Sequence, residues 1–163
     1  MVLDDAAAEI WRGPTGQVAV WMLAPQVIVT RVDGNIQMEG LRFYTSRADR
    51  LILREGRLHV FHHWGGVTTW ESDVRDELRH WAKGHEGRLV GTHFLVRSRV
   101  LSMAIEVAAL ALGRKLHAHR SEATFFAELE NVLGKRASVP PPAPHAPAGI
   151  PRITSRSGLK PRS

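Results

Sequence analysis

Cysteine is absent from the 163 residues of this chain, which excludes disulfide frameworks, thiolate zinc sites, iron–sulfur clusters and cysteine nucleophiles. Long apolar runs are missing as well. The longest, residues 100–112, is interrupted by Ser102 and Glu106 and is shorter than the roughly 20 residues of a membrane-spanning helix. The amino terminus has Asp4 and Asp5 where a signal peptide would be basic. The sequence therefore predicts a cytoplasmic protein without a transmembrane segment.

Positive charge is concentrated at one end of the chain. There are 22 Lys and Arg against 16 Asp and Glu, but six of the cations and none of the acids lie in residues 135–163. The remaining residues carry equal numbers of both signs, so we expect no nucleic-acid binding by the folded domain. Seven of the nine prolines lie in the same end, which predicts a Pro-rich, basic, disordered tail. Its role is either a solubilising appendage or a linear motif for a partner.

Strand-like and helical patterns alternate over residues 17–134. Strands are predicted at 18–23, 27–32, 58–63, 89–96 and 115–119, and helices at 37–54, 69–83, 99–112 and from Ser121 onward. The first two strands form a hairpin, and helices separate the later ones. This order predicts an α/β fold with a mainly parallel β-sheet of about five strands, an N-terminal hairpin and four helices. Residues 1–16 form an N-terminal segment. The apolar helix 99–112 is either packed on two sides or available to a second copy in a homodimer.

Motifs of nucleotide-binding and hydrolytic enzymes are missing. The sequence has no G-x-x-x-x-G-K-S/T, no G-x-G-x-x-G and no G-x-S-x-G, so no catalytic residue and no cofactor is predicted. Histidine is frequent, however, and the predicted strands contain His59, His63, His93, His117 and His119, with His62 on the opposite face of its strand. Because strand side chains alternate, His59 shares a face with His63, and His117 shares a face with His119. Neighbouring strands would bring these residues into one cluster. No His-Glu-x-x-His pattern accompanies them, so no metal site is predicted.

Residues 64–75 combine several features of a recognition surface. Gly65 and Gly66 predict a turn between a strand and a helix, with a partly exposed Trp64 beside it. Thr68-Thr69-Trp70-Glu71 fits a capping box, in which Thr68 covers a free backbone N–H and Glu71 reaches back. Trp70, Val74, Leu78 and Trp81 then mark the buried face of the following helix.

The order of elements and the stretch from His59 to Val74 resemble the STAS superfamily, the anti-sigma-factor antagonists and their relatives, and more closely the bacterial STAS/SEC14-like proteins. In that superfamily a strand ends in Asp, a turn closes on Val, and Asp-Ser-Ser-Gly opens the next helix. Here Val67 matches the Val, and Glu71 and Ser72 match the Asp-Ser. His63 replaces the strand-end Asp, and Asp73-Val74 replaces Ser-Gly.

The resemblance implies a non-enzymatic, regulatory protein–protein interaction module whose helix-opening serine is phosphorylated by a kinase-like partner. The phosphorylation candidate is then Ser72. The expected partner-binding residues are Trp64, Gly65, Gly66, Thr68, Thr69, Glu71, Ser72 and Arg75. Two alternatives remain. One is a carrier of a lipid or small apolar ligand, which the apolar helix 99–112 and the SEC14 likeness suggest. The other is a histidine-based metalloenzyme.

Overall fold

The computed structural model describes residues 3–70, 72–99, 102–103, 105–107 and 115–137. In chain order the elements are η1 (Asp5–Ala7), β1 (Glu9–Arg12), β2 (Gly16–Ala24), β3 (Val27–Ile36), α1 (Met38–Glu55), β4 (Leu58–Trp70), α2 (Ser72–Gly84), β5 (Leu89–Leu95), β6 (Leu116–His119) and α4 (Glu122–Ala137). Helical residues are also described at 99, 102–103 and 105–107, and the rest of the predicted helix 99–112 lies outside the described residues.

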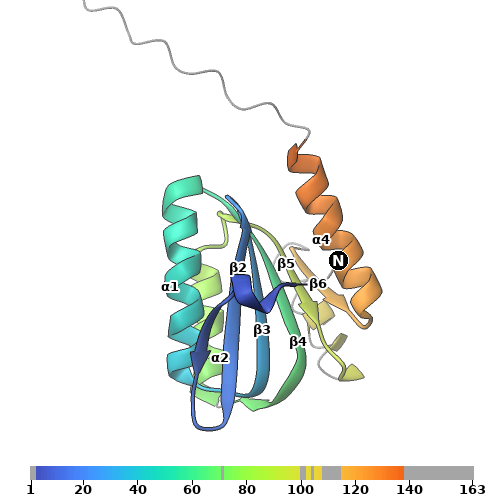
Figure 1. Cartoon of the computed structure of the whole chain (residues 1–163). Helices are drawn as coiled ribbons and strands as arrows, with labels where there is room; N and C mark the ends of the chain where they lie inside the picture. Colours follow the sequence, from blue (N-terminus) through green and yellow to red (C-terminus); the bar gives the residue numbers. More distant parts are fainter. Residues whose placement is uncertain (1–2, 71, 100–101, 104, 108–114, 138–163) are drawn as a thin grey trace, which may run out of the picture.

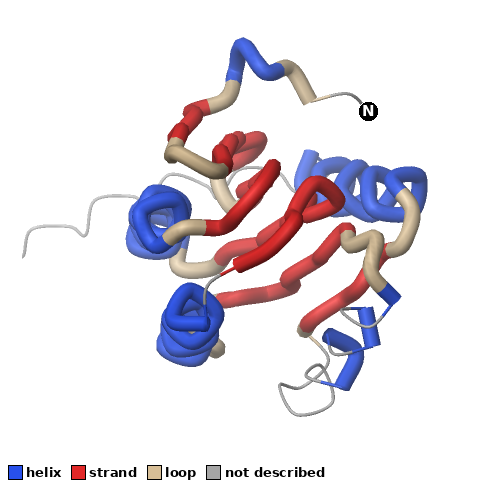
Figure 2. The backbone as a smooth tube through the Cα atoms, turned by 90° about the horizontal axis from the view of Figure 1, so that it is seen from below, coloured by secondary structure: helices blue, strands red, loops and turns tan. Residues whose placement is uncertain are grey.

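One six-stranded sheet runs through the molecule in the order β1-β2-β3-β4-β5-β6 (Figure 2). β1, β2 and β3 are antiparallel neighbours, whereas β3, β4, β5 and β6 are all parallel. The predicted hairpin, parallel sheet and α/β class are therefore confirmed. The sixth strand is β1, which lies inside the segment 1–16 and which the sequence pattern did not predict.

Helices cover both faces of this sheet. α1 and α2 lie on one face and α4 on the other (Figure 1). Alternate residues of each central strand supply the two cores: Ile28 and Val60 face α1 and α2, while Val29 and Phe61 face α4. Burial on both faces accounts for the continuous apolar runs of β2 and β3.

Local signals set the end of α1 and the start of α4 where the sequence places them. α1 ends at Gly56, which has a φ of 74° and closes the helix with its N–H bonded to the carbonyl of Ile52. α4 begins after Ser121, whose hydroxyl accepts a hydrogen bond from the N–H of Thr124 at 3.2 Å. Within the described residues, no helix is both long and apolar enough to cross a membrane.

Two strands extend further than their sequence patterns indicate. β3 was predicted to end at residue 32, but it continues through Gly34, which has a φ of 87°, to Ile36. β4 continues past His63 to Trp70, and β3 pairs with it along this extension, with irregular register near Asp33 and Gly34. The two extensions support each other because each supplies backbone partners to the other.

Candidate functional site

The junction between β4 and α2, residues 64–75, differs from its prediction in its glycines and in its helix cap. Gly65 and Gly66 lie inside β4 and form no strand-to-helix turn. Thr68 lies in the same strand and α2 begins only at Ser72, so Thr68 is not the N-cap of a helix starting at 69 and the predicted capping box is wrong. Glu71 lies outside the described residues. The junction is a strand that leads directly into a helix.

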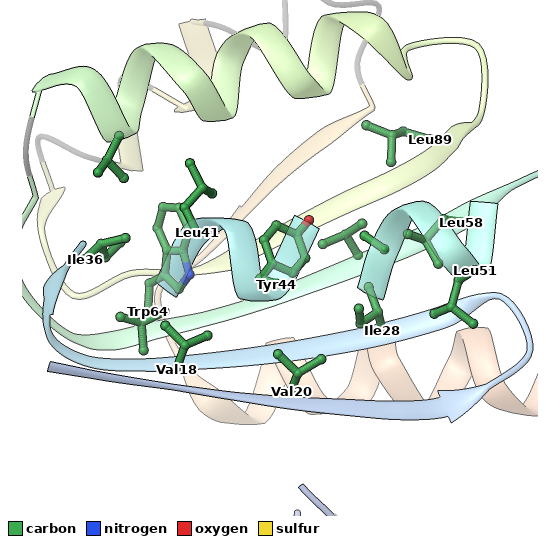
Figure 3. Close-up of a cluster of buried hydrophobic side chains, with 14 of the residues drawn as sticks. Val18, Val20, Ile28, Ile36, Leu41, Tyr44, Leu51, Leu58, Trp64 and Leu89 are labelled. Carbon is green, nitrogen blue, oxygen red and sulfur yellow. The ribbon is translucent and has the colours of Figure 1, made fainter. Parts of the chain in front are cut away.

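Trp64 was expected to be partly exposed, and this prediction is wrong. The side chain is only 7% exposed and belongs to the core beneath α1 and α2. Figure 3 shows its indole ring beside Leu41, and Val18 and Ile36 lie close by. The ring also contacts His62 and Phe94, with centroid distances of 4.7 and 5.1 Å. The Trp64 side chain is therefore part of the core beneath the junction and does not contribute to the outer surface of the junction.

Gly66 is required by a close approach between two strands. It lies opposite Asp33 in the register of β3 and β4. A Cβ atom on residue 66 would collide with Asp33 Oδ1 and lie 3.1 Å from the carbonyl oxygen of Val32. At Gly65 the space is more open, and the nearest atom to a Cβ would be Nε of Arg97 at 3.5 Å. Gly66 thus allows the close approach of β3 and β4, and Arg97 lies beside Gly65.

The exposed part of the junction is formed by the last residues of β4 and the first turn of α2. Thr68 and Thr69 are exposed. The residue before them, Val67, packs against the core. In α2, Val74 is buried, and Asp73 and Arg75 are exposed. This alternation leaves two hydroxyls and two charges of opposite sign on the outside.

The start of α2 already carries a negative charge. The carboxylate of Asp73 accepts a hydrogen bond of 2.9 Å from the N–H of Val74, which would otherwise be free at the helix start. In the next turn, Oδ1 of Asp76 lies 3.5 Å from Nε of Arg75 and 3.3 Å from Nη1 of Arg79. Ser72 is the first residue of the helix. An anion at Ser72 would meet the positive end of the helix dipole but also a neighbouring carboxylate.

A buried polar pair lies under the junction in the middle of the sheet. Nδ1 of His62 is 2.7 Å from the hydroxyl of Thr30, and both side chains are buried. Burial lowers the pKa of His62 from its ordinary 6.5 to about 3, so the imidazole is neutral at physiological pH. Its ring also packs against Tyr44, Trp64 and Phe94. Aromatic side chains therefore fill the core directly beneath the junction.

The opposite face of the sheet contains a second candidate site. His59, His93, His117 and His119 line a pocket of about 320 Å³ together with Val90, Gly91, Glu128 and Val132. The strand alternation had predicted such a cluster if the strands were neighbours, and β4, β5 and β6 are neighbours. The sequence did not indicate Glu128, because only the docking of α4 brings this carboxylate to the strands.

The imidazoles of this cluster contact one another directly. His93 Nδ1 and His119 Nε2 lie 3.1 Å apart, and the ring of His117 stacks on His93 with a centroid distance of 4.7 Å. Among the residues that the structure describes, no three His, Asp or Glu side chains have the arrangement of metal ligands. The His93–His119 contact has the length of a hydrogen bond, in which one ring nitrogen donates and the other accepts.

Comparison with known proteins identifies the fold. No protein-family model and no curated protein matches this chain. Among solved structures, the chain is similar to an uncharacterized protein of the DUF3478 family from Shewanella loihica, which has a SpoIIAA-like fold. The TM-score is 0.56 at 9% sequence identity, over 76% of this chain and 92% of that chain. The predicted STAS-like α/β fold is thereby confirmed. At this identity the likeness concerns the fold alone.

Proposed function

We propose that the chain is a non-enzymatic, cytoplasmic STAS-type module that binds another protein through the exposed side of the β4–α2 junction. One observation carries the proposal: Thr68, Thr69, Asp73 and Arg75 are exposed at the point where β4 leads into α2, above a buried Trp64. A fixed backbone loses little freedom when a partner docks on it, which favours binding. Trp64 itself is left out of the binding surface because its side chain belongs to the core.

Phosphorylation of Ser72 is the proposed switch of this surface. A phosphate would add roughly two negative charges at the first residue of α2, next to the exposed carboxylate of Asp73. The helix dipole stabilises an anion there, so the chain itself tolerates the change. A partner that docks on Thr68, Thr69 and Arg75 would meet an altered charge. The proposed result is release of the partner.

The alternative of a lipid or apolar-ligand carrier finds less support. The apolar cavity lined by Val18, Thr30, Ile36, Tyr44, Trp64 and their neighbours has a volume of about 20 Å³. That is room for about one water molecule, whereas ligand pockets measure roughly 300 Å³ or more. The larger pocket, on the α4 face, is lined by four imidazoles and the carboxylate of Glu128 as well as by Val90, Gly91 and Val132, so it is not an apolar cavity. The described core therefore favours the interaction module.

Affinity capture followed by a binding measurement tests the proposal. The parent chain is used as bait in a lysate of its source cell, and the captured partner is purified and titrated against variants. Thr68→Glu, Arg75→Glu and Ser72→Glu are expected to weaken binding at least tenfold, whereas Ser72→Ala binds like the parent. Leu53→Glu is the matched control, because Leu53 is 78% exposed on α1, away from the junction. If all three charge variants bind with parental affinity, the junction is not the interface.

A further inference from the structure

The histidine pocket lies between the parallel strands β4, β5 and β6 and the helix α4. His59 comes from β4, His93 from β5, and His117 and His119 from β6, while Glu128 and Val132 of α4 form the opposite wall. Gly91 creates the space: a Cβ on residue 91 would lie 3.1 Å from His93 Nε2 and 3.5 Å from His59 Nδ1. The pocket is thus a gap between the imidazoles of the sheet and one side of α4.

Within the cluster, His93 is the central ring. It is 5% exposed and stacks between Phe61 and His117, with centroid distances of 4.3 and 4.7 Å. Its Nδ1 also makes the 3.1 Å contact with His119 Nε2. A contact between two imidazole nitrogens requires one unprotonated nitrogen. Full protonation of both rings removes this hydrogen bond and replaces it with repulsion between two cations.

α4 rests directly on these rings. Its residue Phe125 is fully buried, and its ring contacts Phe61, His63 and His119 edge-on at centroid distances of 5.6, 5.9 and 5.8 Å. Leu129 and Val132 continue the apolar contact along the helix. The helix therefore docks by an apolar side against strand residues that are mainly histidines and apolar side chains.

Carboxylates are too few around the cluster to balance its full protonation. Among the described residues, the titratable or charged groups on this face are His59 and His63 of β4, His93 of β5, His117 and His119 of β6, Arg31 of β3, and Glu122 and Glu128 of α4. Glu122 lies 3.6 Å from His63, and Arg31 is paired with Asp5. Glu128 is the carboxylate that lines the described pocket together with His59, His93, His117 and His119.

We propose that this cluster is a proton-operated latch: with neutral imidazoles α4 stays docked on the sheet, and protonation of His93 and His119 releases α4. The released helix exposes Phe61 and Phe125. The latch uses the face opposite to the β4–α2 junction, so it does not depend on the proposed function.

The shifts of the imidazole pKa values agree with this geometry. Burial, with further contributions from His117, His119 and His59, lowers the pKa of His93 to about 3. Burial and His117 also lower the pKa of His119, while Glu128 acts in the opposite direction. After release, both side chains return towards the ordinary value of 6.5. Protons therefore bind more strongly to the released state, and release becomes more favourable as the pH falls from about 6.5 towards 3, by up to tenfold per pH unit for each proton taken up.

Hydrogen–deuterium exchange on the full chain tests the latch. Protection factors, corrected for the intrinsic pH dependence of exchange, are measured from pH 7.5 to 4.5 for the amides of α4 and of β3. We expect α4 to lose protection at a higher pH than β3, with a steep pH dependence. In the double variant His93→Gln/His119→Gln, the α4 amides should lose this extra pH dependence. His80→Gln, at an exposed position of α2, is the matched control and should behave like the parent.

Two milder variants keep the test decisive if the double variant does not fold. Glu128→Gln removes the carboxylate that favours protonated His119 in the docked state, so release should shift to higher pH. His117→Gln removes a neighbour that disfavours the protonated forms of His93 and His119, so release should shift to lower pH. Shifts of opposite sign support the latch. Simultaneous loss of protection in α4 and β3, or unchanged release in both variants, overturns it.

Discussion

Thr30 and His62 lie directly opposite each other on β3 and β4, and the Thr30 hydroxyl is 2.7 Å from His62 Nδ1 with both side chains buried. This hydrogen bond joins two neighbouring parallel strands in the most apolar part of the molecule. A buried imidazole nitrogen that loses its partner keeps its desolvation cost without compensation. Burial keeps His62 neutral, and its hydrogen bond with Thr30 helps to hold the two strands in register.

Removing the hydroxyl should be costly at this position. Thr30→Val retains nearly the same shape but leaves His62 Nδ1 without its partner, so we expect a loss of about 1–3 kcal/mol in the free energy of unfolding. Urea denaturation at pH 7.5 measures it. The matched control is Thr68→Val, which makes the same chemical change on the exposed end of β4 and should stay within about 0.5 kcal/mol. Equal losses at both positions would contradict the buried role of the pair.

Stability should fall in mild acid. The pKa of His62 and that of His93 are both lowered to about 3 by burial, against 6.5 in the unfolded chain. Below pH 6.5 the unfolded state therefore binds more protons, and the stability present above that pH is lost as the pH falls towards 3. The expected slope approaches about 1.4 kcal/mol per pH unit for each histidine.

Urea denaturation between pH 7.5 and 4.5 measures this slope. His62→Gln should reduce it by the contribution of one histidine, whereas the exposed His80→Gln should leave it unchanged. A slope that is the same in the parent and in His62→Gln would show that His62 is not the buried neutral group described above.

Gly66→Ala should destabilise the junction. The added methyl group would collide with the carboxylate of Asp33 and approach the backbone of Val32, and such overpacking costs about 1–3 kcal/mol. Gly87→Ala is the control, because nothing lies within 4 Å of a Cβ at that position. Thermal melting of both variants gives the comparison. In an Asp33→Ala background the penalty of Gly66→Ala should shrink, since part of the collision is removed; an unchanged penalty would assign it to the backbone of Val32 alone.

The fold was predictable because most of its elements have local signals. β-branched runs gave β2 and β3, the 3.6-residue spacing gave α1, and Gly56 and Ser121 mark helix ends that the structure confirms. β1 has no such signal: its four residues Glu9–Arg12 form a strand because β2 offers a free edge, and the register pairs Ile10 with Ala19. The formation of β1 depends on its pairing with β2, and a local sequence pattern does not contain this tertiary contact.

The sequence singled out the β4–α2 junction as a candidate site but did not predict the backbone geometry of this junction. Gly65-Gly66 and the hydroxyls at 68 and 69 are typical of a turn, yet pairing with the extended β3 keeps them in a strand. Trp64 looked exposed beside two glycines, but the same extension directs its ring into the core. The predicted start of the tail at residue 135 is wrong, because residues 135–137 belong to α4; residues 138–163 lie outside the described residues, and their disorder stays a prediction. That binding occurs at this junction and that Ser72 is phosphorylated also stay predictions.

The contact between α1 and α2 provides a last test, because one carboxylate joins the two helices. Trp81 Nε1 of α2 donates a hydrogen bond of 2.7 Å to Asp49 Oδ1 of α1, and the Trp81 ring packs against Tyr44 at 5.5 Å. Trp81→Phe keeps an aromatic ring there but removes the donor, so it should cost about 1.5–3 kcal/mol, the range for hydrogen bonds to charged groups. A double-mutant cycle with Asp49→Ala, measured by urea denaturation at pH 7.5, separates this bond from packing, and we expect an interaction energy of about 0.5–3 kcal/mol. If Trp81→Phe costs the same with and without the Asp49 carboxylate, its effect comes from ring packing alone, and α2 is held on α1 by apolar contacts without this hydrogen bond.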